Sequence, residues 1–83
     1  MSDEPIYFTE KEIADLMGDD MLCHIKYGGD LWLINPMTDG RYVLTQIQMS
    51  DRQLVNQTYH RELAEAREEL LSSLSAMMRD LVF

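Results

Sequence analysis

The thiol and imidazole of two adjacent residues, Cys23 and His24, are the first candidates for chemistry in this chain. A neighbouring imidazole can lower the pKa of a thiol and so create a nucleophile or a metal ligand. The surrounding residues predict a β-strand, however, and adjacent strand residues point to opposite faces of a sheet. A structural zinc site also needs four ligands, and His60 is the only other histidine or cysteine. We therefore predict that Cys23 is a small buried hydrophobic residue and that the chain holds no metal.

Paired carboxylates at residues 19–20 and 68–69 could in principle serve acid–base catalysis or bind a cation. Neither pair lies in a calcium-loop pattern such as D-x-D-x-D-G, so we interpret both as solvated charge. Gly28 and Gly29 lack the G-x-G-x-x-G or P-loop context of a nucleotide site, which favours a turn instead. Because no motif indicates catalysis, we expect a protein that is not an enzyme and that needs no cofactor.

The length and composition predict one small domain over residues 1–83. Of the 83 residues, 46% are hydrophobic and 27% are charged, which is ordinary for a chain that folds around a single core. The formal net charge is −8, a sign that disfavours nucleic acids and anionic membranes as direct partners. A single cysteine excludes an internal disulfide, and no apolar run approaches the length of a membrane span. We expect a cytoplasmic protein.

The first half of the chain predicts a helix followed by a sheet. Residues 1–8 form a short acidic lead-in, and residues 9–49 hold the first helix and three strands. Thr9 and Glu12 match a capping box, and Gly18 suits a helix end, which predicts a helix over residues 10–17. Residues 21–34 predict a β-hairpin whose tight turn is centred either on Gly28 and Gly29 or on Gly29 and Asp30, with the same residues on each face in both cases. One face of this hairpin is expected in the core: Cys23, Ile25, Tyr27, Trp32 and Ile34.

The third strand is predicted over residues 41–49, after a segment rich in turn-forming residues at 35–40. The sequence leaves its register open, because one residue more or less in the turn exchanges the two faces of the strand. The residues that join the core face are then either Tyr42 and Leu44, or Val43, Thr45 and Ile47.

A long amphipathic helix is predicted over residues 50–83. Residues 50–53 match a second capping box, and an apolar stripe recurs at three- and four-residue spacing from Leu63 onward. A helix of some thirty residues would be about 45–48 Å long, whereas a strand of six or seven residues spans about 20–23 Å. We therefore expect either a break near Ser72 and Ser73 or a helix face that packs on a second copy or a partner. That face consists of Leu70, Leu74, Met77, Met78 and Leu81.

These elements predict an α+β fold of order α-β-β-β-α, in which the long C-terminal helix packs on a three-stranded antiparallel sheet. Residues 9–18 resemble the first helix of helix-turn-helix regulators, but a strand follows where a basic recognition helix should stand. The element order resembles that of the double-stranded-RNA-binding domain, whose basic helix start would fall on residues 50–53, where only Arg52 is basic. In topology, length and acidic charge the chain is also similar to small phage-encoded inhibitors, including anti-CRISPR proteins of the DNA-mimic type.

This last resemblance implies a protein-binding module that docks on the basic, nucleic-acid-binding site of a host complex such as a CRISPR effector. Exposed acids would then pair with arginines that otherwise hold phosphate. We expect the partner-binding acids to be Asp15, Asp19, Asp20, Asp30 and Asp39. The alternative hypothesis is a structural or regulatory homodimer assembled through the C-terminal helix. A third hypothesis, from a different class, is an enzyme or small-ligand binder that uses His24, Tyr27 and Trp32.

Overall fold

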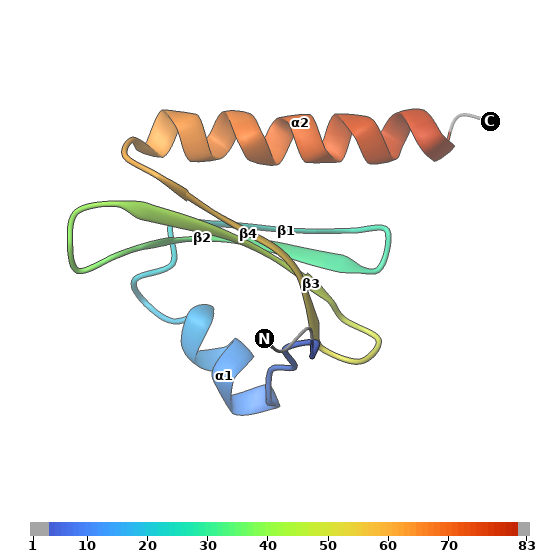
Figure 1. Ribbon diagram of the computed structural model, residues 1–83, viewed down its shortest axis with the longest axis horizontal. Coiled ribbons are helices and arrows are strands. Elements are labelled where there is room, and N and C mark those ends of the chain that lie inside the picture. The colour runs from blue at the N-terminus through green and yellow to red at the C-terminus, as the bar shows by residue number, and fades with distance from the viewer. Residues whose placement is uncertain (1–3, 82–83) are drawn as a thin grey trace.

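The chain forms a four-stranded antiparallel sheet with one helix on each face (Figure 1). The computed structural model describes residues 4–81, and their side chains up to Met77. The elements in chain order are α1 Glu10–Leu16, β1 Cys23–Tyr27, β2 Asp30–Pro36, β3 Tyr42–Gln48, β4 Gln53–His60 and α2 Leu63–Leu81. The strands lie side by side in that same order. The α+β class is confirmed, and the prediction of three strands is wrong because residues 53–60 add a fourth.

α1 begins as the capping box predicts. The Thr9 hydroxyl accepts a hydrogen bond from the Glu12 N–H at 3.1 Å, and the Glu12 carboxylate accepts one from the Thr9 N–H at 2.9 Å. These bonds satisfy backbone donors that a helix start otherwise leaves without partners. The helix turns its apolar side toward one face of the sheet. The buried cluster between them consists of Ile13, Leu31, Leu33 and Ile47.

β1 and β2 form the predicted hairpin. Tyr27 pairs with Asp30, so Gly28 and Gly29 alone make the turn. Their φ angles are 60° and 85°, the left-handed values that both central residues of a type I′ turn require. This turn matches the right-handed twist of the strands, which explains why two consecutive glycines occur here.

The register of β3 decides which of its residues face α2. Leu44 pairs with Ile34, so Tyr42 and Leu44 lie on the α2 face. On the α1 face, Thr45 and Ile47 are also buried, at 1% and 0% exposed. Each of the two alternative sets therefore has buried members, because a helix covers each face of the sheet. The buried cluster on the α2 face consists of Trp32, Ile34, Leu44, Ala66 and Leu70, with Cys23, Ile25 and Tyr27 packed against it.

The second predicted capping box is wrong, because residues 50–52 form a turn and β4 follows it. The Asp51 carboxylate accepts a hydrogen bond from the Gln53 N–H at 3.1 Å, and Arg52 has a φ of 61°. β4 then pairs with β3, with an irregularity where the pairing passes from Gln46 to Ile47. A short side chain that bonds nearby backbone suits both a turn and a helix start, so the local sequence does not separate the two.

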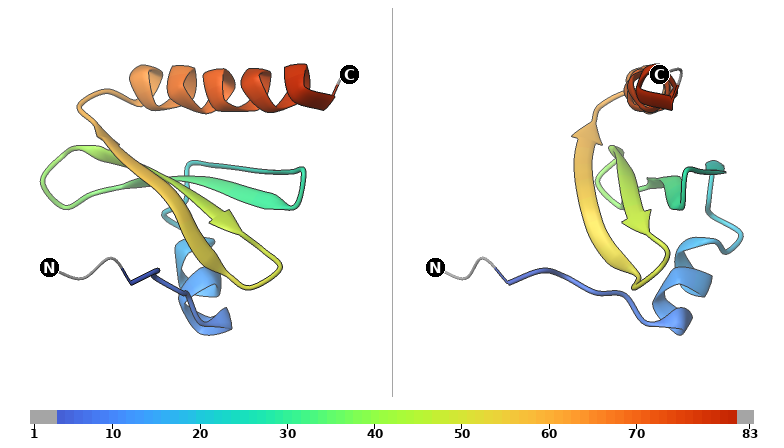
Figure 2. Two further views of the ribbon diagram at one scale, coloured as in Figure 1. Left: turned by 45° about the vertical axis from the view of Figure 1, so that its right-hand side comes forward. Right: turned by 90° about the vertical axis from the view of Figure 1, so that its right-hand side faces the viewer.

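The lead-in pairs with the start of β4. Tyr7 forms a bridge with Gln53, and the Leu54 N–H donates to the Ile6 carbonyl at 2.8 Å. Beyond Leu54, no other segment of residues 4–81 lies on the outer side of β4 (Figure 2). Residues 6–8 therefore cover only the first part of this sheet edge.

α2 spans 19 residues and runs without a break past Ser72 and Ser73. At about 1.5 Å per residue it is about 28 Å long, close to the roughly 26 Å of an eight-residue strand. The predicted mismatch between helix and sheet is therefore wrong, because residues 53–60 belong to the sheet. Among the described residues, neither helix is long and apolar enough to cross a membrane.

α2 lies over one face of the sheet (Figures 1 and 2), and its apolar stripe packs against that face as far as Met77. Leu70 is 2% exposed and belongs to the core, and Leu74 and Met77 pack half-buried against it. These three residues of the expected partner-binding face thus cover the sheet. The side chains of the other two, Met78 and Leu81, lie outside the described residues.

Candidate functional site

A concentrated negative charge lies on α1 and on the turn that follows it. Residues 9–22 contain five acidic residues against one lysine, whereas residues 61–69 contain four acidic residues against two arginines. All six charged side chains of the first segment are exposed. We call this set the α1 acidic surface: Glu10, Lys11, Glu12, Asp15, Asp19 and Asp20.

The sheet fixes the position of α1. A seven-residue helix is not stable by itself, so its packing must hold it in place. Ile13 is 7% exposed, and Leu16 and Met17 pack against the same buried cluster. The Asn35 side-chain amide donates to the Leu16 carbonyl at 2.8 Å, which ties β2 to the last turn of the helix. Because the apolar side faces the sheet, the acidic residues face solvent.

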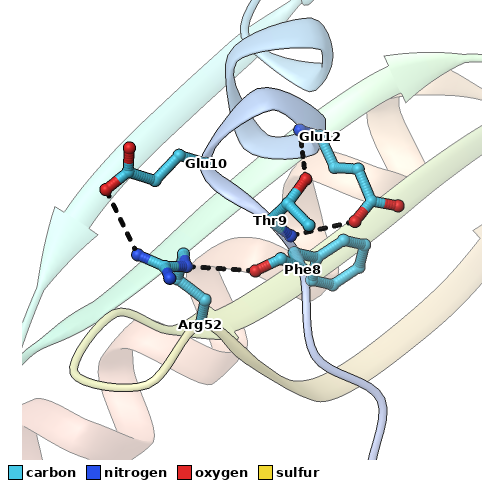
Figure 3. A network of polar contacts seen from close by, with 5 residues as sticks. All are labelled: Phe8, Thr9, Glu10, Glu12 and Arg52. Carbon is cyan, nitrogen blue, oxygen red and sulfur yellow. Dashed lines mark hydrogen bonds and ion pairs between the residues drawn. The ribbon is translucent and has the colours of Figure 1, made fainter.

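Arg52 anchors the start of α1 (Figure 3). Its Nε donates to the Phe8 carbonyl at 3.1 Å, and its Nη1 lies 3.5 Å from Glu10 Oε1. The Glu12 carboxylate is engaged in the capping box. Groups of the chain itself therefore already contact these two glutamates. We did not expect Glu10 to belong to the site, and its place in the first turn of a capped helix was the only signal for it.

Three carboxylates of the α1 acidic surface have no partner within residues 4–81: those of Asp15, Asp19 and Asp20. Asp15 lies in the last turn of α1, which contains no basic residue. A carboxylate there is unfavourable for the helix, because the C-terminal end of a helix carries partial negative charge. The other two are neighbours in the following turn, so their charges repel each other. The fold thus presents three exposed acids that form no ion pair with any residue from 4 to 81.

The structure separates the other two predicted partner-binding acids from this surface. Asp30 begins β2 and is half-buried, and the Gln46 side-chain amide donates to its carboxylate at 2.7 Å. Asp39 follows the opposite end of β2, where the Arg41 Nε lies 2.7 Å from its carboxylate. The Arg41 backbone N–H, and then its guanidinium, lower the pKa of Asp39. Only three of the five predicted acids therefore share one element and its following turn.

Cys23 and His24 do not form a joint site. Cys23 is half-buried against the α2-face cluster, whereas His24 is exposed on the other side of β1. This arrangement follows from the alternation of side chains along a strand. Within the described residues, no group of three or more histidine, cysteine or acidic side chains is placed to hold a metal ion.

The small-ligand hypothesis finds only part of its expected site. Trp32 is 1% exposed under α2, and His24 lies on the opposite face of the sheet, so the two cannot line one pocket. A hollow of about 320 Å³ does lie at the β1–β2 turn. It is lined by Lys26, Tyr27, Gly28, Gly29, Asp30 and Met49. Of the three expected residues, only Tyr27 contributes to it.

Comparisons with protein-family models, with curated proteins and with solved structures find no match to this chain. Among the described surfaces, the α1 acidic surface combines a rigid support with charge that the chain leaves uncompensated.

Proposed function

We propose that this chain is a small protein-binding module that docks through its α1 acidic surface on a basic site of another protein. The proposed partner is a nucleic-acid-binding complex of a host cell, such as a CRISPR effector. The chain would act as a phage or mobile-element inhibitor that occupies the place of phosphate. The supporting observation is that Asp15, Asp19 and Asp20 are exposed on a supported helix end without a cation from the described residues.

The energetics of such docking favour arginine as the contacting residue of the partner. Hydrogen bonds between guanidinium and carboxylate are charge-assisted and about twice as strong as neutral ones, and they select planar groups. Since α1 is already packed on the sheet, binding would not have to order the helix first, which lowers its entropic cost. The net charge of −8 also steers the chain toward positive surfaces and raises the association rate.

The same charge argues for a protein partner and against direct contact with nucleic acid. Proteins that bind nucleic acids gain affinity from lysines and arginines that replace counterions on phosphate. The sequence has seven basic residues against 15 acidic ones. Of the basic residues, Arg41 and Arg52 are already paired with acids of the chain. A chain of this kind competes with nucleic acid for a basic site instead of binding it.

The test compares two charge reversals of equal size on opposite sides of the sheet. Asp19→Lys with Asp20→Lys changes the α1 acidic surface, and Glu68→Lys with Glu69→Lys changes two exposed acids of α2 by the same amount. The immobilised chain is exposed to bacterial lysate at about 0.1 M and about 1 M salt, between which the Debye length falls from ~10 Å to ~3 Å.

We expect proteins retained at the lower salt concentration to be released at the higher one and by a competing DNA oligonucleotide. The reversal at residues 19 and 20 should abolish their retention, and the reversal at residues 68 and 69 should not. Failure to retain any protein at low salt would contradict the proposal. Equal retention by both double variants would do the same, because docking would then not depend on the α1 acidic surface.

A further inference from the structure

β4 is a sheet edge with little of the usual protection against pairing beyond the irregularity opposite Gln46 and Ile47, which is of the bulge type that also protects edges. It is the longest strand, with eight residues, and contains no acid, lysine, arginine, proline or glycine. Edge strands of soluble proteins are commonly protected by short length, charged side chains, prolines or a covering segment. The opposite edge follows this rule, since β1 has five residues and carries the exposed Lys26. The two edges of the sheet therefore differ in their readiness to accept another strand.

The outer side of β4 already forms a backbone hydrogen bond at its start. The Leu54 N–H donates to the Ile6 carbonyl, and the lead-in pairing reaches no further along the strand. Within residues 4–81, residues 55–60 have no neighbour on that side. Val55 and Tyr59 lie on this open stretch and are 49% and 53% exposed. An open stretch of six residues is about 20 Å long, enough for a strand of ordinary length.

We infer that a second copy of this chain occupies the open stretch of β4, with the two β4 strands antiparallel across a twofold axis. The two sheets then form one continuous sheet of eight strands. Two chains of −8 repel each other and can approach closely only where neither presents an acid, and residues 55–60 contain no acid, lysine or arginine. The exposed amide of Asn56 both donates and accepts, so it can bond to a polar side chain of the second copy.

The assembly closes at two copies. Each chain uses its β4 edge in the pairing, and the only other edge is the short, charged β1. A twofold interface of this kind uses the same surface on both subunits and leaves none for a third. The α1 acidic surface takes no part in the pairing, so the dimer is independent of the proposed docking function.

The alternation of side chains restricts the register of this pairing. The Gln57 amide donates to Thr45 Oγ1 on the α1 face, and Thr58 lies opposite Leu44 on the α2 face. A twofold axis perpendicular to the sheet keeps each face continuous, so directly opposed residues must come from the same face. The axis therefore passes through a residue and not between two residues. For a pairing centred on residues 55–60, that residue is Gln57 or Thr58.

The test measures the dimer dissociation constant by sedimentation equilibrium. Asn56→Lys places a positive charge within two residues of the twofold axis, so the two added charges of the dimer repel each other. We expect the dissociation constant to rise at least about tenfold. His24→Lys is the matched control, since it adds the same charge at an exposed position of the other edge strand, and the constant should stay within about twofold. Asn56 is exposed, so a circular dichroism spectrum like that of the wild type is expected for both variants.

A mixing experiment separates pairing from general charge effects. Asn56→Glu should also weaken self-association, whereas an equimolar mixture of Asn56→Lys and Asn56→Glu should recover dimers at the wild-type level or above. A wild-type chain that stays monomeric up to about 500 µM would overturn the inference. So would a dimer whose constant Asn56→Lys leaves unchanged, or one that His24→Lys weakens equally. None of these three results would bear on the charge reversal at residues 19 and 20.

Discussion

Replacing Gly28 with alanine tests whether α2 runs unbroken over the β1–β2 turn. A Cβ atom at Gly28 would lie 2.7 Å from Met77 Cε, well inside the usual separation of about 3.5–4.0 Å between carbon atoms. Gly29 offers a matched control in the same turn. Its φ is also positive, at 85°, but no atom lies within 4 Å of its ideal Cβ position.

The expected cost has one part that both glycines share and one that only Gly28 has. A residue with a Cβ atom loses about 1–2 kcal/mol of stability in the left-handed backbone conformation. About 0.4–1 kcal/mol of this loss is offset, because alanine lowers the conformational entropy of the unfolded chain. Gly29→Ala should therefore destabilise the fold by about 1 kcal/mol. Gly28→Ala should add about 1 kcal/mol, since the end of Met77 must move out of its packed position.

The assay is urea unfolding followed by the fluorescence of Trp32, which is 1% exposed in the folded chain. Gly28→Ala, Met77→Ala and the double variant form a cycle, and their coupling energy should be about 1 kcal/mol. Gly29→Ala combined with Met77→Ala should show no coupling. If Gly28→Ala costs the same with and without Met77, the side chain does not lie over the turn and the reasoning fails. A helix broken near Ser72 would give that result.

Two further predictions concern local polar contacts. Thr9→Ala removes the N-cap of α1 and should lower the free energy of unfolding by about 1 kcal/mol in the same assay. Thr9→Ser should retain most of the stability, because serine also caps helices. Equal stability of all three chains would contradict the capping role. Arg41→Gln should raise the pKa of Asp39 in an NMR titration but leave it below its ordinary value, because the backbone N–H of residue 41 still donates to the carboxylate. Since the folded pKa is the lower one, this contact stabilises the fold above the unfolded pKa and is lost as pH falls through the folded value. An Asp39 pKa that Arg41→Gln leaves unchanged would show that the guanidinium has no part in the shift.

The elements with strong short-range signals could be predicted from the sequence. The capping box of Thr9 and Glu12 places the start of α1 correctly, and the turn residues place the β1–β2 hairpin, whose turn the structure assigns to the first of the two alternatives, Gly28 and Gly29. Both features depend on bonds between residues two to four positions apart, so the sequence contains the whole interaction. The apolar stripe that begins at Leu63 likewise identifies α2, because a helix repeats its faces within a few residues.

The fourth strand could not be predicted in the same way. Residues 50–53 carry the same short polar side chains in a turn as in a helix start, and here Asp51 bonds the Gln53 N–H as a turn residue. Residues 53–60 gain their backbone hydrogen bonds from β3, a pairing that local sequence does not specify. Assigning them to a helix made α2 look too long for its sheet, and the expectation of an unpaired helix face rested on that length.

For the candidate site, the sequence by itself determined the sign and amount of charge, and the capped helix that carries Asp15. Only the tertiary structure decided which acids remain available, because the carboxylates of Asp30 and Glu10 find partners that are 16 and 42 residues away along the chain. It also decided that the apolar stripe of α2 is satisfied within the chain and that β4 is the exposed edge. The physical reason is the same in each case: a side chain's composition sets what it can bind, whereas packing between distant segments sets what it still has free to bind.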